Sequence, residues 1–276
     1  MKNCIISALV LTVSITTLEN CKEKIKDTGA DKIYDERYAN LYDTLWHDPD
    51  KYHWEVGKIL SEFKPSMKKQ SLLDAGCGTG THYSLLAKHF EVTGLDISNA
   101  MLARARAKNP TGKFLPADLR DKETFTAGQF DFIVSMYEAS FYTQEIDKIL
   151  SNYNHWLKPG GGLLLVTIDP DKLTRERVQD KLDLSHKGTD KRGTTGFFKT
   201  GWWQKADAER GFFYHEMIHF NNAETIERHH LLFLPPVKKI LRYAEQRGLK
   251  STRTIPSPFF KQETLLFFRK SNISAP

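Results

Sequence analysis

Residues 72–82 of this 276-residue chain read Leu72-Leu73-Asp74-Ala75-Gly76-Cys77-Gly78-Thr79-Gly80-Thr81-His82. A short apolar run leads into a glycine-rich turn and then into a helical pattern, which predicts a buried strand, a tight turn and a helix. In a doubly wound α/β sheet, such a turn lies at the carboxyl ends of the strands, where ligands bind. Glycines there let the backbone approach a ligand closely. A plain tight turn is the alternative for the pattern alone.

Three further features indicate which ligand this turn would bind. Its glycines follow a Gly-x-Gly-x-Gly spacing, whereas the dinucleotide fingerprint needs its third glycine one position later, where Thr81 stands. Asp74, just before the turn, would repel a pyrophosphate but suits a cationic amino-acid ligand. Asp96 ends the next predicted strand, where a carboxylate accepts both hydroxyls of a ribose. These features favour a nucleoside with a cationic amino-acid end and disfavour a nicotinamide-dependent dehydrogenase.

The rest of the chain alternates between short apolar runs and amphipathic stretches. Strands are predicted at Ser71–Ala75, Glu91–Asp96, Gly112–Pro116, Phe130–Met136, Gly162–Ile168, Thr252–Ile255 and Glu263–Phe268. Helices are predicted at Thr81–His89, Ser98–Ala107 and Gln144–Leu157, after a helical pattern from Tyr34 to Phe63. Because strands alternate with helices, we expect a doubly wound, mostly parallel seven-stranded α/β sheet with helices on both faces.

This alternation breaks after Ile168. Residues 170–210 are polar and irregular, and the segments Gly211–Phe220 and Glu224–Leu234 then predict two strands joined as a hairpin around residues 221–222. An amphipathic helix follows over Val237–Arg247. We therefore expect an antiparallel hairpin insertion at about 170–234 inside one domain that spans residues 34–276.

The first 33 residues differ from this domain. Lys2 precedes a mostly apolar run from Cys4 to Leu18, which is short for a bilayer span and typical of a secretory signal. Residues 18–21 resemble a degenerate bacterial lipobox with Cys21 as the lipidated residue, and residues 19–33 predict a polar linker. An uncleaved apolar helix is the alternative. The segment leaves export or a membrane tether open.

Charge and cysteine content exclude several kinds of partner. The net charge is +6, and the lysines and arginines are scattered apart from short clusters at 22–26 and 238–242. Nucleic-acid binders concentrate their charge in a stripe, so we expect no nucleic-acid partner. The three cysteines form no disulfide framework, and no Cys or His spacing matches a zinc site. We therefore expect no bound metal. Four histidines on the predicted hairpin, His215, His219, His229 and His230, are interpreted as strand-face residues near a substrate, and a metal cluster is the alternative.

The motifs together resemble class I S-adenosylmethionine-dependent methyltransferases. Residues 72–82 resemble motif I of that family, and Asp96 resembles its partner acid. The segment 117–119 resembles the adenine-binding segment, in which Asp118 would accept from the exocyclic amine. Residues 130–136 resemble the fourth strand, whose end lies beside the transferred methyl group. The resemblance implies S-adenosylmethionine as the cofactor and a cytoplasmic location, because this cofactor is cytoplasmic.

A narrower resemblance is to bacterial N,N-dimethyltransferases that act on nucleotide-linked aminosugars. It rests on residues 77–82, on the Tyr42-Asp43 pair with Tyr52 after it, and on the hairpin end at 230–233. In those enzymes the hairpin covers the active site. The resemblance implies cofactor contacts by Tyr42, Asp74, Gly76, Cys77, Gly78, Gly80, His82, Asp96, Ile97, Met101, Asp118, Leu119 and Met136.

Four residues just after the fourth strand are candidates for the methyl-acceptor side: Tyr137, Glu138, Ser140 and Tyr142. Methyl transfer is an in-line displacement, so the enzyme mainly has to align donor and acceptor, and a nearby acid or phenol positions the acceptor or takes its proton. Tyr142 and Glu138 are the first choices. The sequence thus predicts N- or O-methylation of a small molecule, with a tethered or secreted non-catalytic binding protein as the alternative.

Overall fold

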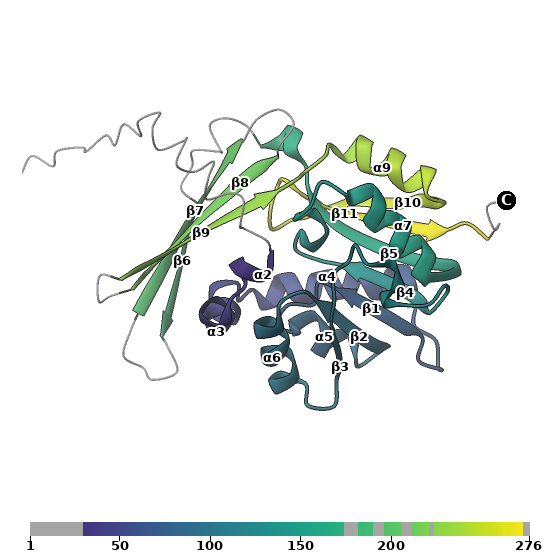
Figure 1. The fold of residues 1–276 in the computed structure, drawn as a ribbon, viewed down its shortest axis with the longest axis horizontal. Helices are drawn as coiled ribbons and strands as arrows, with labels where there is room; N and C mark the ends of the chain where they lie inside the picture. Colours follow the sequence, from purple (N-terminus) through teal and green to yellow (C-terminus); the bar gives the residue numbers. More distant parts are fainter. Residues whose placement is uncertain (1–29, 174–181, 190–195, 206–210, 221–223, 273–276) are drawn as a thin grey trace, which may run out of the picture.

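The computed structural model describes residues 30–173, 182–189, 196–205, 211–220 and 224–272 (Figure 1). The predicted signal segment, Cys21 and most of the predicted linker lie outside the described residues. Over the described ranges, no helix is both long and apolar enough to cross a bilayer.

The larger sheet has seven strands in the order β10-β11-β5-β4-β1-β2-β3. Its parallel part consists of β1 (Ser71–Ala75), β2 (Glu91–Asp96), β3 (Lys113–Pro116), β4 (Phe130–Ser135) and β5 (Leu157–Ile168). Its antiparallel edge consists of β11 (Glu263–Lys270) and β10 (Leu249–Pro256). The chain runs outward from β1 to β3 and then returns to β4 on the other side of β1. Doubly wound sheets bind ligands at such a reversal, and the predicted fold class is confirmed.

Helices cover both faces of this sheet (Figure 1). On one face α4 (Pro49–Phe63) and α5 (Thr81–Leu86) bury Ile59, Phe63 and Leu86 against the strands. On the other face α7 (Ile146–Trp156) and α9 (Val237–Gln246) bury Ile149, Trp156 and Ile240. The remaining elements of this region are α6 (Asn99–Lys108), η2 (Lys122–Thr124), η3 (Ala139–Phe141) and η4 (Pro170–Lys172).

The helical pattern predicted over residues 34–63 forms two helices, α3 (Glu36–Leu45) and α4. The break has a local cause: the Asp48 side chain accepts from the N–H of Lys51 at 3.0 Å, and Pro49 takes the first helical position. Both features start a new helix. A further short helix, α2 (Ala30–Ile33), lies at the end of the stretch interpreted as linker.

A second sheet of four antiparallel strands has the order β6-β7-β8-β9. The predicted hairpin forms its edge pair, β8 (Phe212–Phe220) and β9 (Thr225–Leu232). The prediction that residues 170–210 are irregular was wrong in part, because β6 (Leu182–Thr189) and β7 (Gly196–Lys205) lie there. β6 is mostly polar and β7 carries its aromatic residues in adjacent pairs, so neither shows sustained alternation along its length. Each strand forms by hydrogen bonding to a partner that lies later in the chain.

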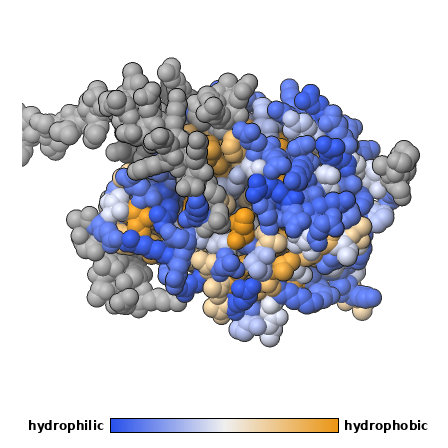
Figure 2. Space-filling view, in the orientation of Figure 1, coloured by the Kyte–Doolittle hydropathy of each residue, from blue (hydrophilic) through white to orange (hydrophobic). Residues whose placement is uncertain are grey.

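The N-terminal helices lie between the two sheets (Figure 1). Tyr38 and Leu45 of α3 pack against Ile218 and Ile226 on the second sheet. Figure 2 shows a largely hydrophilic face on which patches of hydrophobic residues lie where the second sheet meets the main domain. The space between the sheets, lined by aromatic side chains, is therefore where a ligand would find apolar surface.

Candidate functional site

The loop after β1 depends on glycine. Gly76 has a φ of +80°, and a Cβ placed there would lie 2.2 Å from the Cβ of Ala139. The N–H groups of Gly76 and Cys77 donate to the carbonyl oxygen of Leu95 at 2.7 and 2.9 Å, which joins the loop to the end of β2. No side chain fits at Gly76 without moving η3, so this close approach explains the first glycine of the motif.

Two carboxylates flank this loop, of which Asp74 is buried and Asp96 is half-buried. Asp96 accepts from the N–H of Gly78 and of Ser98, both at 2.9 Å, so its carboxylate faces the loop as the sequence predicts. Asp74 is 1% exposed, and its Oδ2 has no hydrogen-bond partner among the described residues. Burial raises the pKa of Asp74 to about 6, against an opposing effect of His82. Such an oxygen is costly to bury unless a ligand supplies a donor or a positive charge.

A cavity of about 230 Å³ opens beside these carboxylates at the carboxyl ends of β1, β2 and β4. Its lining includes Tyr42, Asp74, Gly76, Cys77, Gly78, His82, Asp96, Ile97, Met101, Asp118, Leu119 and Met136, which are all of the predicted cofactor residues except Gly80. Gly80 instead precedes α5, where a Cβ would lie 3.1 Å from that of Ala105 on α6. The third glycine therefore lets the two helices lie close together.

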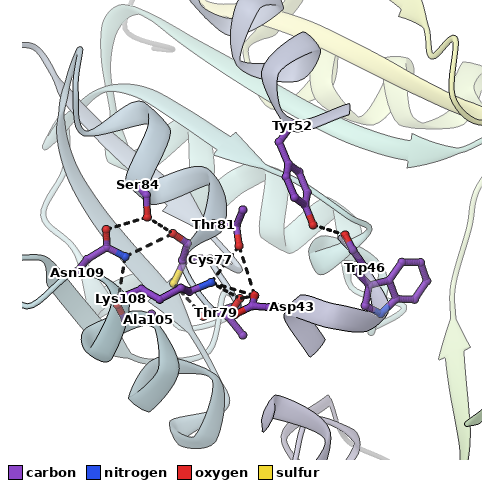
Figure 3. A network of polar contacts seen from close by, with 12 residues as sticks. Asp43, Trp46, Tyr52, Cys77, Thr79, Thr81, Ser84, Ala105, Lys108 and Asn109 are labelled. Atoms are coloured by element: carbon purple, nitrogen blue, oxygen red, sulfur yellow. Dashed lines mark hydrogen bonds and ion pairs between the residues drawn. The ribbon is translucent and has the colours of Figure 1, made fainter. Parts of the chain in front are cut away.

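An ionic network outside the predicted set ties α3 to the glycine loop (Figure 3). Asp43 accepts from the hydroxyls of Thr79 and Thr81, and it pairs with Lys108 of α6 at 2.9 Å. Lys108 also donates to both threonine hydroxyls at 3.0 Å. Because Tyr42 precedes Asp43, the network holds the Tyr42 ring over the cavity.

A second cavity, of about 440 Å³, adjoins the first. The two cavities share Tyr34, Tyr42, Tyr137 and Tyr142 as lining residues. The second is bordered further by Trp46, Glu138, Trp203, Tyr214, Phe259, Phe260, Lys261 and Glu263, among others. The predicted acceptor-side residues Glu138 and Tyr142 therefore both lie here, and the tyrosines form the boundary between the two cavities.

The backbone is strained at two residues beside the tyrosines that separate the two cavities. Tyr137 and Glu138 have φ values of +46° and +59°, a region that non-glycine residues rarely adopt. Glu138 Oε1 is buried and has no hydrogen-bond partner among the described residues. Burial raises the pKa of Glu138 to about 8, and the nearby Glu263 raises it as well. Strain of this kind clusters at functional sites, and here it points a buried carboxyl group into the second cavity.

Tyr142 begins a chain of polar contacts that leads into the second sheet. Its hydroxyl lies 2.7 Å from the Tyr34 hydroxyl and 2.7 Å from Nδ1 of His230 on β9. Nε2 of His230 lies 3.6 Å from a carboxylate oxygen of Glu216 on β8. The sequence predicted His230 as a strand-face residue but did not predict its contacts with Tyr142 and Glu216. The signal that could have found it is the alternation along β9, where His230 shares its face with the buried Ile226.

A second buried network lies below the two cavities. Lys51 Nζ lies 2.7 Å from Glu55 and 2.5 Å from Glu263, and Glu55 lies 2.8 Å from Nε2 of His82. Lys51 and Glu55 are each 1% exposed. His82 lines the first cavity and Glu263 the second, so the network supports both. Sequence reasoning missed it because its members come from α4, α5 and β11.

The remaining candidates have other surroundings. Asp118 lines the first cavity and is held by the guanidinium of Arg120. Ser140 is buried and bonds to Ser135 and Tyr153, so it lines neither cavity.

The four histidines of the hairpin do not converge. His215 and His229 contact each other at 2.8 Å on the outer face of the second sheet, whereas His230 is buried on the inner face. No group of three side chains able to hold a metal occurs among the described residues.

Comparison with known proteins places these features in a family. The methyltransferase domain family matches residues 72–161. The chain is 30% identical over 223 residues to the malonyl-[acyl-carrier protein] O-methyltransferase of Halalkalibacterium halodurans, covering 73% of this chain and 78% of that protein. It is also 30% identical over 145 residues to a dTDP-3-amino-3,4,6-trideoxy-alpha-D-glucopyranose N,N-dimethyltransferase of Streptomyces venezuelae. That match covers 50% of this chain and 59% of the relative, so the chain spans little more than half of its length.

Solved structures agree in fold. DesVI of Streptomyces venezuelae superimposes with a TM-score of 0.70 at 22% identity, over 85% of this chain and 98% of that one. CalS10, an amino pentose methyltransferase from Micromonospora echinaspora solved with S-adenosylmethionine bound, gives a TM-score of 0.65 at 20% identity, over 85% and 96% of the two chains. These structures share the fold, and the 30% identity over 78% of a methyltransferase shows that the chain belongs to the S-adenosylmethionine-dependent methyltransferases.

Proposed function

We propose that this protein transfers a methyl group from S-adenosylmethionine to an amino group of a small molecule. The observation that carries the proposal is the Glu138 carboxyl, whose buried oxygen has no partner among the described residues and which lines the second of two adjoining cavities. One cavity matches the cofactor, and the other is large enough for a small acceptor. A binding protein would not need this second cavity, so the pair favours an enzyme.

The residues of the first cavity fit the cofactor. Asp96 would accept from the ribose hydroxyls, and the unpartnered oxygen of Asp74 would take the methionine ammonium group. Ile97, Met101 and the segment 117–119 would enclose the adenine. Bound S-adenosylmethionine supplies a methyl group already activated by its sulfonium. The tyrosines between the two cavities would then align the acceptor with this methyl group and exclude water. Because the donor is already activated, the reaction needs little more from the protein.

The charges of the second cavity favour an amine as the acceptor. Its described lining contains two carboxyl groups, Glu138 and Glu263, and a single cationic side chain, Lys261. Above about pH 8, where Glu138 is ionised, a carboxylate acceptor would be repelled, whereas an amine would donate its N–H to Glu138. The rings of Trp46 and Trp203 offer flat apolar surface for a sugar or other ring. We therefore propose an aminosugar or a similar small amine.

The direct test incubates the full chain with methyl-labelled S-adenosylmethionine and a panel of small amines, alcohols and carboxylic acids. We expect label in amines. Because burial raises the pKa of Glu138 to about 8, KM is measured above that pH, where the carboxylate is charged. There Glu138→Gln is expected to raise KM for the amine about 10- to 100-fold, because a hydrogen bond to a charged group contributes about 1.5–3 kcal/mol. The matched control is Glu245→Gln, which changes an exposed glutamate on α9 and should leave KM unchanged. Labelling of acids or alcohols alone would contradict the proposal.

The pKa of Asp74 predicts how cofactor binding depends on pH. In the free protein this carboxyl is ionised only above about pH 6. The methionine ammonium group binds the ionised form, so the affinity for S-adenosylmethionine is expected to weaken as the pH falls through about 6. Calorimetry between pH 5 and pH 8 measures this, with proton release on binding as a second readout. In Asp74→Asn the affinity should be weak and independent of pH over this range; an unchanged pH profile would contradict the assignment.

The domain limits and the location of the reaction follow from the same proposal. Residues 34–276 form the catalytic unit, with the second sheet inserted at about 170–234. The reaction takes place in the cytoplasm, where S-adenosylmethionine is available, whatever the fate of the N-terminal segment.

A further inference from the structure

A series of buried polar side chains leads from the boundary of the two cavities into the second sheet. Its contacts are hydrogen bonds as far as His230, and the contact from His230 to Glu216 is longer and ionic. Starting from Tyr34, the series passes through the Tyr142 hydroxyl to Nδ1 of His230, with both contacts at 2.7 Å. It ends at Glu216, 3.6 Å from Nε2 of His230. His230 is 3% exposed and Glu216 is fully buried. Polar side chains of this kind are costly to bury, and these lead toward the second cavity instead of toward solvent.

The donors and acceptors among these side chains follow from the protonation states of a phenol and an imidazole. If Tyr142 donates to Nδ1, the neutral imidazole carries its proton on Nε2, on the side of Glu216. A carboxylate at that position stabilises the imidazolium that forms when Nδ1 takes a proton. Burial raises the pKa of Tyr142 well above its usual value, so this hydroxyl stays neutral and can pass a proton on without holding a charge.

We propose that Tyr142, His230 and Glu216 form a relay that removes the proton from the methylated acceptor nitrogen. This inference rests on the proposed function. Methylation leaves the acceptor nitrogen cationic, with a proton to lose. That proton passes to the Tyr142 oxygen while Tyr142 passes its own proton to Nδ1 of His230, and the N–H electron pair stays on nitrogen. The products are a neutral methylated amine and an imidazolium on His230 beside Glu216. After product release, the His230 imidazolium returns the proton to water.

In this relay the second sheet supplies two of the three residues that move the proton. Glu216 and His230 come from β8 and β9, whereas Tyr142 comes from the loop after η3. Glu138 would hold the acceptor N–H and Tyr142 would take the proton, so binding and proton removal are assigned to different groups. A second methylation of the same nitrogen also requires a neutral amine, and the relay would supply it.

The first experiment does not depend on activity. In full chain labelled with ¹⁵N-histidine, the imidazole shifts report which nitrogen of His230 carries the proton. We expect Nε2 to be protonated in the wild type and a mixture of tautomers in Tyr142→Phe. The resonance is assigned by its loss in His230→Asn. A proton on Nδ1 in the wild type would overturn the relay, because Tyr142 could not then pass a proton to it.

The second experiment measures kinetics with an amine that the wild type methylates. In His230→Asn, the amide oxygen can still accept from Tyr142 but takes up no proton. We expect kcat to fall about 10- to 100-fold, with KM and S-adenosylmethionine affinity little changed. Glu216→Gln should act in the same direction. The control is His229→Asn, the adjacent histidine on the outer face of β9. A wild-type kcat in His230→Asn overturns the relay alone, whereas failure of the wild type to methylate any amine overturns the proposed function.

Discussion

Replacing Asp96 by alanine is expected to weaken S-adenosylmethionine binding by at least about 100-fold. The ribose hydroxyls would lose two charge-assisted hydrogen bonds, each contributing about 1.5–3 kcal/mol. The loss is increased because the same carboxylate accepts from the N–H groups of Gly78 and Ser98 and so holds the glycine loop against β2. Isothermal titration calorimetry on the full chain measures the effect, and circular dichroism checks that the variant is folded.

Two further variants separate the possible causes of this loss. Asp96→Asn keeps an acceptor for one backbone N–H but removes the charge, so its affinity should lie between those of alanine and wild type. Glu91→Gln changes a carboxylate at the other end of β2, which is exposed and paired with Lys113, and should leave binding unchanged. Wild-type affinity in Asp96→Ala would reject the placement of the ribose.

Replacing Lys51 by methionine is expected to lower the free energy of unfolding by about 3–5 kcal/mol. Lys51 is 1% exposed and is bonded to both Glu55 and Glu263, so its removal takes the shared ammonium group from two buried carboxylates, of which Glu55 keeps its contact with His82. The packing of the side chain is largely kept, because methionine has a similar length. Denaturant unfolding followed by circular dichroism measures the change.

The matched control for Lys51→Met is Lys113→Met. Lys113 also pairs with a glutamate, Glu91, but the two side chains are 64% and 59% exposed, so its loss should cost less than about 1 kcal/mol. The cost of Lys51→Met should also shrink as the pH falls, because the two buried carboxyls become neutral by protonation. Equal costs for the two lysines would show that burial does not strengthen the inner network.

The cofactor side of the site could be predicted from sequence because its signal is local. The turn from residue 76 to residue 80 and the acids that precede it and end the next strand follow one another along the chain. Asp74 and Asp96 are adjacent in space because β1 and β2 are parallel neighbours in register, which the βαβ pattern already implies. The motif could not reveal that Gly80 serves the packing of α5 on α6 instead of the cavity.

On the acceptor side, Tyr137, Glu138 and Tyr142 could be predicted, because they follow β4 closely in the chain. His230 and Glu216 could not be predicted as partners, because they lie on two strands, and only the pairing register of β8 and β9 places both side chains on the inner face. Asp43 and Lys108 lie far apart in sequence and meet only because α3 folds onto α6. Strands β6 and β7 have no sustained periodic pattern of their own, so only the pairing of β7 with β8 and of β6 with β7 shows them as strands.

The amino-acid sequence alone determined the doubly wound architecture, the class of cofactor and the loop that receives it, because hydrophobic periodicity, glycine spacing and strand-end acids act over short distances along the chain. Only the tertiary structure decided which charges are buried, which tyrosines separate the two cavities, and which residues of the second sheet reach the acceptor. Burial and hydrogen-bond partners are set by segments brought together from across the whole chain, and no local pattern encodes them.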